Sequence, residues 1–193
     1  MTVNVRLWWY VARAGGLVAW TLLAASTLWG LALTTRAFAG RAAARWLLDL
    51  HRFLGGLAVV FVGVHLTGVV ADTFVHFGLA DVLVPLASTW HPVWVAWGIV
   101  ALYLLVAVEI TSLLRSRLPH RLWKAVHGLS FPLFAVATVH VLVAGTDTDD
   151  AWALWPVLAV TMAVSFLAVA RAAAGPRPER AVDPGARPLP APD

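Results

Sequence analysis

The chain contains no cysteine among its 193 residues. This absence excludes disulfide bonds, thiolate metal sites and cysteine-ligated iron–sulfur clusters. Histidine is therefore the main candidate for binding a transition metal, and the sequence contains seven histidines.

Charged residues are also scarce, because Asp, Glu, Lys and Arg make up only 12% of the chain, whereas a soluble domain carries about 25%. Five stretches contain no charged side chain: 14–35, 53–71, 93–108, 125–146 and 151–170. Each, with its flanks, is long enough to cross a hydrocarbon core of about 30 Å as a helix. The alternating pattern of a membrane β-barrel is missing. The sequence therefore predicts an all-α, polytopic transmembrane bundle of about five helices, with no separate soluble domain.

The chain divides into three expected parts. Residues 1–13 are predicted to form an interfacial segment, residues 14–173 the bundle, and residues 174–193 a disordered tail rich in proline. The expected helices cover residues 14–35, 42–75, 92–114, 120–144 and 151–172.

Basic residues are unevenly distributed between the expected connections. They gather in the first and third connections and in the tail, whereas the second and fourth connections contain acidic residues but no Lys or Arg. By the positive-inside rule, this places the N-terminus outside and the C-terminus in the cytoplasm, with the protein in the plasma membrane. The net charge of +4 is explained by this topology, so the expected surroundings are a lipid bilayer and nucleic acid is not an expected partner.

Four histidines lie inside two apolar helices of this bundle. His51 and His65 are 14 residues apart, and His127 and His140 are 13 apart. Both helices are expected to run outward from the cytoplasm, so one histidine of each helix lies at an inner level and one at an outer level, roughly 20 Å away. A haem iron held between two imidazoles needs this arrangement. We therefore expect two haem b groups, with the inner iron on His51 and His127 and the outer iron on His65 and His140. Two alternatives remain open: histidines that satisfy one another or backbone carbonyls, and a histidine metal site without porphyrin.

The angular positions of these histidines test the idea. At about 100° per residue, His65 lies only about 40° from His51, with Gly55, Ala58 and Val62 on the face between them. His140 lies about 140° from His127 in an ideal helix, which is a poor match. Pro132 lies between these two and removes one backbone hydrogen bond, so a kink or local change of twist would correct the mismatch.

The pattern His51-x13-His65 with His127-x12-His140 resembles the transmembrane domain of ferric reductases and NADPH oxidases, as does the segment from Thr111 to His127. The resemblance covers about residues 45–145 and implies two stacked b-type haems, paired inner with inner and outer with outer. Family members often continue into flavin and nicotinamide domains, but this sequence has no Gly-rich nucleotide motif after a strand. We also expect no counterpart of the extra helix that precedes the family's usual first span. In size the chain is similar to the haem-binding membrane subunit of the periplasmic methionine sulfoxide reductase system, which implies a separate donor, a flavoprotein being one option.

Other polar residues lie close to these histidines. Arg52, Arg121 and Lys124 are placed to pair with the propionates of the inner haem. Glu109 and Asp49 are expected to form salt bridges with Arg45, Arg52 or Arg121.

The three remaining histidines have weaker assignments. His120 is an alternative inner ligand, although a solvated interfacial role is favoured. His76 and His91 lie on the outer side, where they are candidates for binding an incoming metal ion or proton.

Taken together, the sequence predicts a diheme b-type cytochrome, ferric reductase-like, that carries single electrons from a separate cytoplasmic or membrane donor to an unknown outer acceptor. The competing hypothesis is a cofactor-free membrane anchor or assembly subunit. Whether the chain is itself an oxidoreductase is left open by the sequence.

Overall fold

The structure is a computed structural model that describes residues 6–35, 41–145 and 150–173. Every regular element in these ranges is helical. The expected disordered tail, residues 174–193, lies outside the described residues, and so do residues 1–5.

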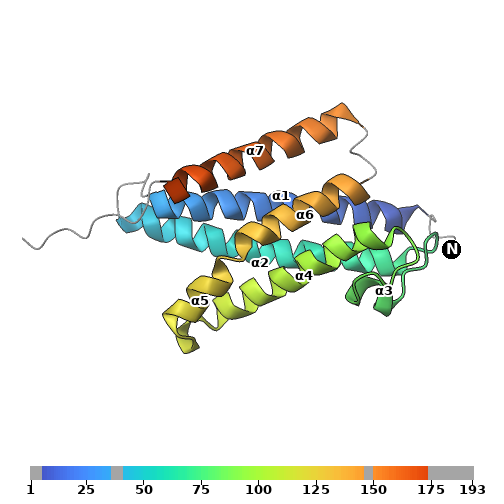
Figure 1. The fold of residues 1–193 in the computed structure, drawn as a ribbon, viewed down its shortest axis with the longest axis horizontal. Coiled ribbons are helices and arrows are strands. Elements are labelled where there is room, and N and C mark those ends of the chain that lie inside the picture. The colour runs from blue at the N-terminus through green and yellow to red at the C-terminus, as the bar shows by residue number, and fades with distance from the viewer. Residues whose placement is uncertain (1–5, 36–40, 146–149, 174–193) are drawn as a thin grey trace, which may run out of the picture.

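Eight helical elements follow one another in the described part of the chain (Figure 1). They are α1 (Leu7–Thr35), α2 (Arg41–Ala71), α3 (Leu79–Leu83), α4 (Pro92–Leu113), the 3-10 turn η1 (Arg115–Arg117), α5 (His120–His127), α6 (Ser130–Ala144) and α7 (Ala151–Ala173). Among the described residues, five segments are long and apolar enough to cross a membrane: α1, α2, α4, α5 with α6, and α7. The predicted all-α bundle of five spans is confirmed.

The first helix begins earlier than expected. Its first residue is Leu7, so most of the segment that was expected to lie at the interface is helical. The guanidinium of Arg13 lies over the ring of Trp9, 4.7 Å from its centroid. These two residues are one turn apart, so the contact stabilises the helix while keeping the charge near its end.

The expected helix over residues 120–144 is divided in two. The Leu129 amide donates to the carbonyl of Val126, and the Phe131 amide donates to that of Gly128. These bonds span three residues rather than four, which tightens the turn between α5 and α6. Pro132 explains the break, since it lacks the N–H that would have bonded to Gly128 in a continuous helix. His127 and His140 therefore belong to two differently directed helices.

Helices α1 and α2 form a close antiparallel pair (Figure 1). At Gly68 an added Cβ would lie 2.5 Å from the backbone nitrogen of Ala12, and at Gly15 it would lie 3.0 Å from that of His65. Small residues allow this approach, as they do in many membrane helix pairs.

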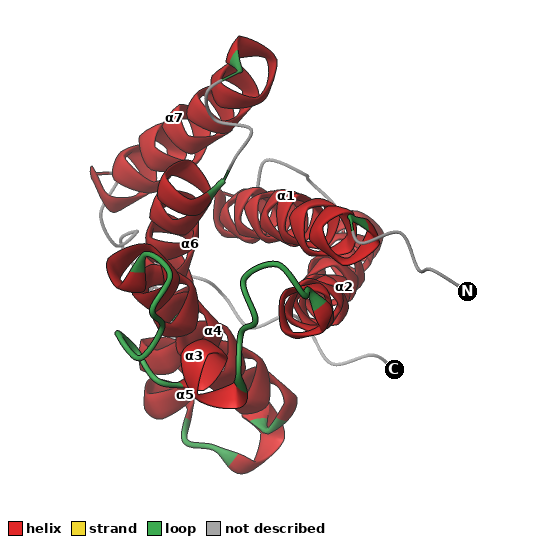
Figure 2. Cartoon of the chain, turned by 90° about the vertical axis from the view of Figure 1, so that its right-hand side faces the viewer, coloured by secondary structure: helices red, strands yellow, loops and turns green. Residues whose placement is uncertain are grey.

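Helices α6 and α7 both pack against α1, and α4 packs mainly against α6. Seen end-on, α7, α6 and α4 form a row beside α1 and α2 (Figure 2). Trp20, Phe134 and Val157 form one buried cluster between α1, α6 and α7. The Trp20 indole donates to the Thr138 hydroxyl at 2.9 Å, a buried hydrogen bond that ties α1 to α6. Helix α6 contacts both α1 and α4. This position brings His140 of α6 close to His65 of α2.

Candidate functional site

The four histidines of the spanning helices meet in two pairs. The ring centroids of His51 and His127 are 6.0 Å apart, and those of His65 and His140 are 6.3 Å apart. We call these the first pair and the second pair. His51 precedes His65 on α2, and His127 precedes His140 on α5–α6. Because first faces first and second faces second, the two segments run in the same direction. The histidines expected at matching depths are therefore adjacent. The break before Pro132 divides the segment that, as one ideal helix, would have placed His127 and His140 on different faces.

Backbone carbonyls orient both rings of the second pair. His65 Nδ1 lies 2.7 Å from the carbonyl oxygen of Ala12 on α1, and His140 Nδ1 lies 2.9 Å from that of Trp94 on α4. A carbonyl oxygen only accepts hydrogen bonds, so each Nδ1 carries the proton and donates. Nε2 then has a free lone pair, which is the state of a histidine that binds a metal.

The first pair is held by serines. His51 Nδ1 lies 3.0 Å from the carbonyl oxygen of Ser26 and 3.1 Å from its hydroxyl. His127 Nδ1 lies 3.4 Å from the hydroxyl of Ser112, the longest of these contacts. The carbonyl fixes His51 in the same protonation state as the second pair, whereas His127 depends on a rotatable hydroxyl.

Glycines of α1 and α4 lie directly against three of these rings. A Cβ on Gly98 would lie 2.7 Å from His140 Cε1, one on Gly16 would lie 2.9 Å from His65 Nδ1, and one on Gly30 would lie 3.3 Å from His51 Cε1. None of the three was identified from the sequence, which pointed to the face of α2 instead. The adjacent pair Gly15-Gly16 in an apolar helix was the available signal for a close approach.

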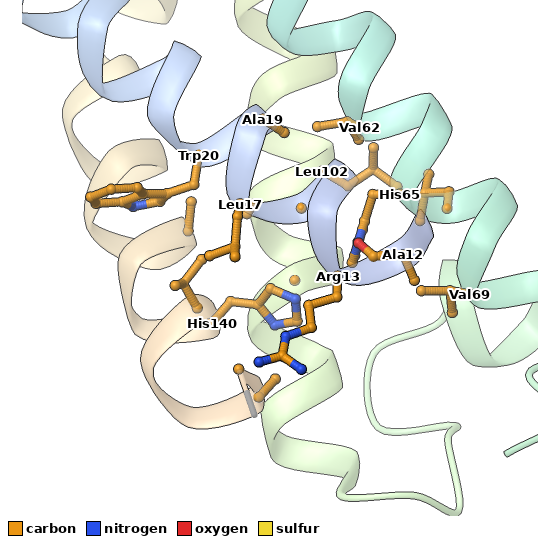
Figure 3. A pocket seen from close by; sticks show the side chains of 18 of the residues that line it. Ala12, Arg13, Leu17, Ala19, Trp20, Val62, His65, Val69, Leu102 and His140 are labelled. Atoms are coloured by element: carbon orange, nitrogen blue, oxygen red, sulfur yellow. The ribbon is translucent and has the colours of Figure 1, made fainter. Parts of the chain in front are cut away.

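The second pair lines a cavity of about 440 Å³. Its walls are mostly apolar and come from all five spanning segments, and Ala58 and Val62 are among them. Figure 3 shows His65 and His140 entering it from opposite walls, with Arg13 beside them. Along α2 the cavity extends beyond His65 as far as Asp72.

Aromatic and cationic side chains surround the first pair. The Trp123 ring stacks on His127 with centroids 5.1 Å apart, and the Arg115 guanidinium lies 4.4 Å above Trp123. The indole nitrogens of Trp123 and Trp29 are buried and have no hydrogen-bond acceptor within the described ranges. Arg115 was not among the residues selected from the sequence, because its contact depends on how η1 turns back over α5.

The three cations selected from the sequence are on the surface. Arg52 pairs with Asp49 at 3.8 Å, which confirms the expected salt bridge of Asp49. Arg121 and Lys124 are exposed on α5.

Glu109 differs from the expectation. Within the described part of the chain it forms no ion pair, and its carboxylate lies against α2, 2.8 Å from the position of a Cβ on Gly55. The expected salt bridge of Glu109 is absent among the described residues, where its carboxylate packs against Gly55 instead.

The remaining histidines lie apart from the pairs. His91 stacks on Trp94 with centroids 3.8 Å apart, and His76 is exposed. His120 packs on Trp123, so His127 and not His120 faces His51. Among the described residues, no three side chains of His, Asp or Glu come together as a metal site.

Both pairs fit an iron porphyrin better than a bare metal ion. Two imidazoles bound to opposite sides of one metal at about 2 Å place their ring centres roughly 6 Å apart, as observed. Each pair offers only two ligands, so the other positions must be filled by the group that brings the metal. The indole N–H of Trp123, which stacks on His127 and has no acceptor among the described residues, suits a carboxylate such as a haem propionate.

A comparison with protein families gives an independent result. The family model of the ferric reductase like transmembrane component matches residues 15–138, well over half of the chain. The match includes His51, His65 and His127 and ends two residues before His140. Comparisons with curated proteins and with solved structures find no match. The chain belongs to the family of ferric reductase like transmembrane components.

Proposed function

We propose that this protein is a diheme b-type cytochrome that carries single electrons across the membrane. Its family and its five apolar helices make it an integral membrane protein of the electron-transfer type, which works with a redox partner. The observation that carries the finer proposal is the geometry of the two histidine pairs. In each pair the rings are spaced for one metal ion between them, and three of the four rings are oriented by a backbone carbonyl.

His51 and His127 would hold one haem b, and His65 and His140 the other. The haem iron supplies the chemistry, a reversible one-electron change between the ferric and ferrous states. The protein holds the imidazoles in place and surrounds the second pair with apolar side chains that limit the access of water. Near the first pair, Arg115 and the indole of Trp123 join Arg52, Arg121 and Lys124 as candidates to bind propionates.

The direction of transfer is proposed from the family resemblance, and the proposed topology assigns each pair to one face of the membrane. With the basic connections in the cytoplasm, the first pair lies near the cytoplasmic face of the plasma membrane and the second near the outer face. The donor is then a separate cytoplasmic or membrane protein, and a flavoprotein has the chemistry to deliver single electrons. The acceptor is on the outside.

An absorption spectrum of the purified protein, with haem counted per chain, tests this proposal. We expect two haems per chain and a Soret band that shifts when dithionite is added. His65→Ala and His140→Ala should each remove one haem, and the double variant should remove no more than either single variant, because both side chains bind the same iron. His120→Ala is the matched control and should retain both haems. A wild-type protein without a Soret band would refute the proposal and favour a cofactor-free anchor.

A further inference from the structure

The wall of the second pair's cavity includes one cation that the proposed function does not use. Among the described lining residues, Arg13 is the only lysine or arginine. It follows Ala12, whose carbonyl orients His65, and it lies one turn before Gly16, which packs against the same ring. Figure 3 shows Arg13 beside His140 as well. The guanidinium therefore lies close to both imidazoles of the pair.

A positive charge at this place needs a compensating group. On the proposed topology Arg13 is near the outer face, where basic residues are disfavoured, and the cavity around it is mostly apolar. A cation among apolar side chains is costly unless an anion or a dipole compensates it. The ring of Trp9 contributes through its face, 4.7 Å from the guanidinium carbon to the ring centroid. Arginine makes its hydrogen bonds from the edge of the guanidinium, so the contact with Trp9 is compatible with binding an anion.

The cavity itself contains one candidate anion among its described lining residues, the carboxylate of Asp72. This residue is only 8% exposed. Its Oδ2 accepts a hydrogen bond of 3.4 Å from the Val75 amide, and its Oδ1 has no hydrogen-bond partner among the described residues. The guanidinium of Arg13 therefore does not donate to Asp72 Oδ1. A haem b held by the second pair would bring two further carboxylates, its propionates, into the same cavity.

We propose that Arg13 binds a propionate of the second pair's haem. The inference rests on the proposed function. A planar guanidinium matches a carboxylate through two parallel hydrogen bonds, which fixes orientation as well as adding affinity. Arg13 then supplies at the second haem the positive charge that the basic residues of η1 and α5 supply at the first. It also gives a function to a basic residue at the face where the positive-inside rule does not expect one.

The rate of haem dissociation from full-length variants that retain a single haem tests the inference. His51→Ala should retain only the second pair's haem, and His65→Ala only the first pair's. In the His51→Ala protein, adding Arg13→Gln should speed the transfer of haem to an excess of a haem-scavenging protein by about tenfold or more, because one charge-assisted pair is lost. In the His65→Ala protein the same change should leave the rate unchanged, since Arg13 lines the cavity of the second pair and not the first.

A modified cofactor identifies the group that Arg13 binds. Iron protoporphyrin dimethyl ester has no charged propionate, and it can be loaded into the His51→Ala protein in place of haem b. Arg13→Gln should speed the loss of haem b but not the loss of the ester. In the protein with both haems, Arg13→Gln should also lower the midpoint potential of the second haem, because a nearby positive charge favours the ferrous over the ferric state. This second measurement does not depend on how well the single-haem variants fold.

Three further variants complete the experiment. Arg13→Lys keeps the charge and should lose less haem than Arg13→Gln. Arg6→Gln removes a charge from an exposed residue just before α1 that does not line the cavity, so it should leave the rate unchanged. If the effect of Arg13→Gln disappears in an Asp72→Asn background, Asp72 is the partner and the inference is overturned.

The remaining outcomes separate the inference from the proposed function. If Arg13→Gln binds two haems and releases both at the wild-type rate, or speeds the loss of the ester as much as that of haem b, the inference alone fails. If the wild-type chain binds no haem, both the inference and the proposed function fail.

Discussion

Gly98→Ala is the smallest change that disturbs a proposed haem ligand without altering its chemistry. The added Cβ would lie 2.7 Å from Cε1, 2.9 Å from Nε2 and 3.0 Å from Nδ1 of His140. Ordinary van der Waals contact begins at 3.4 Å, so the ring has to move by about 0.7 Å. Its Nδ1 is bound to the Trp94 carbonyl at 2.9 Å, one turn before Gly98 on the same helix. The ring cannot retreat from the new methyl group without stretching this hydrogen bond.

The magnitude follows from two opposing effects. Alanine is favoured over glycine in a helix interior by about 0.5–1 kcal/mol, which stabilises the fold. Overpacking of a filled site costs about 1–3 kcal/mol. Here the cost falls on the histidine, because the nearest atoms belong to its ring and not to the backbone. We therefore expect a protein that still folds and that binds the second pair's haem about 5–150-fold more weakly.

The assay is the number of haems per chain, measured together with thermal unfolding in detergent. Gly56→Ala and Gly63→Ala are matched controls on α2, since no atom outside the helix lies within 4 Å of either added Cβ. Both controls should retain two haems. Gly30→Ala, whose Cβ would lie 3.3 Å from His51 Cε1, should weaken the first pair's haem only slightly. A Gly98→Ala protein with two tightly bound haems and an unchanged spectrum would refute the reasoning.

Two further predictions concern hydrogen bonds. Thr138→Val should lower the free energy of unfolding by about 1–3 kcal/mol, because it leaves the buried Trp20 indole N–H without an acceptor. Thr161→Val is the control and should change the free energy of unfolding little, since its hydroxyl bonds to Val157 in its own helix. Equal losses of stability in the two variants would contradict this prediction. Ser112→Ala should weaken binding of the first pair's haem by roughly 10-fold or more, because it removes the hydroxyl near His127. Ser26→Ala should leave haem affinity nearly unchanged, since the backbone carbonyl of residue 26 still orients His51. A larger loss of haem affinity in Ser26→Ala than in Ser112→Ala would show that the Ser26 hydroxyl, and not its carbonyl, orients His51.

Much of the fold followed directly from the scarcity of charge. Long uncharged stretches leave few alternatives to spanning helices, because the backbone must satisfy its own hydrogen bonds in lipid. The ends of the helices were harder to predict. Helix α1 begins at Leu7 and includes Arg13, whose guanidinium lies over the ring of Trp9 one turn earlier.

The histidine pairs were predictable because helix geometry alone places them at matching depths. The angular mismatch between His127 and His140 was a real conflict within the sequence, and Pro132 correctly marked where it would be resolved. The break lies at Gly128 and Leu129, one turn before Pro132, because proline has no N–H to bond to the Gly128 carbonyl.

The groups that orient the histidines could not be found from sequence. Every residue has a backbone carbonyl, so nothing in the sequence identifies those of Ala12 and Trp94 as the acceptors. The glycines of α1 and α4 become meaningful only once it is known which helices face the histidines. Asp72 Oδ1, which is buried without a hydrogen-bond partner among the described residues, likewise owes its position to the turn after α2.

Electron paramagnetic resonance of the oxidised protein tests the central claim most directly, because it reports the ligands of each ferric iron. The ring planes are inclined by 80° in the first pair and by 79° in the second. We predict two low-spin ferric signals of equal intensity, both of the strongly anisotropic type that nearly perpendicular imidazole planes produce. A high-spin signal in the wild-type protein, or a single low-spin signal from one haem per chain, would contradict the account.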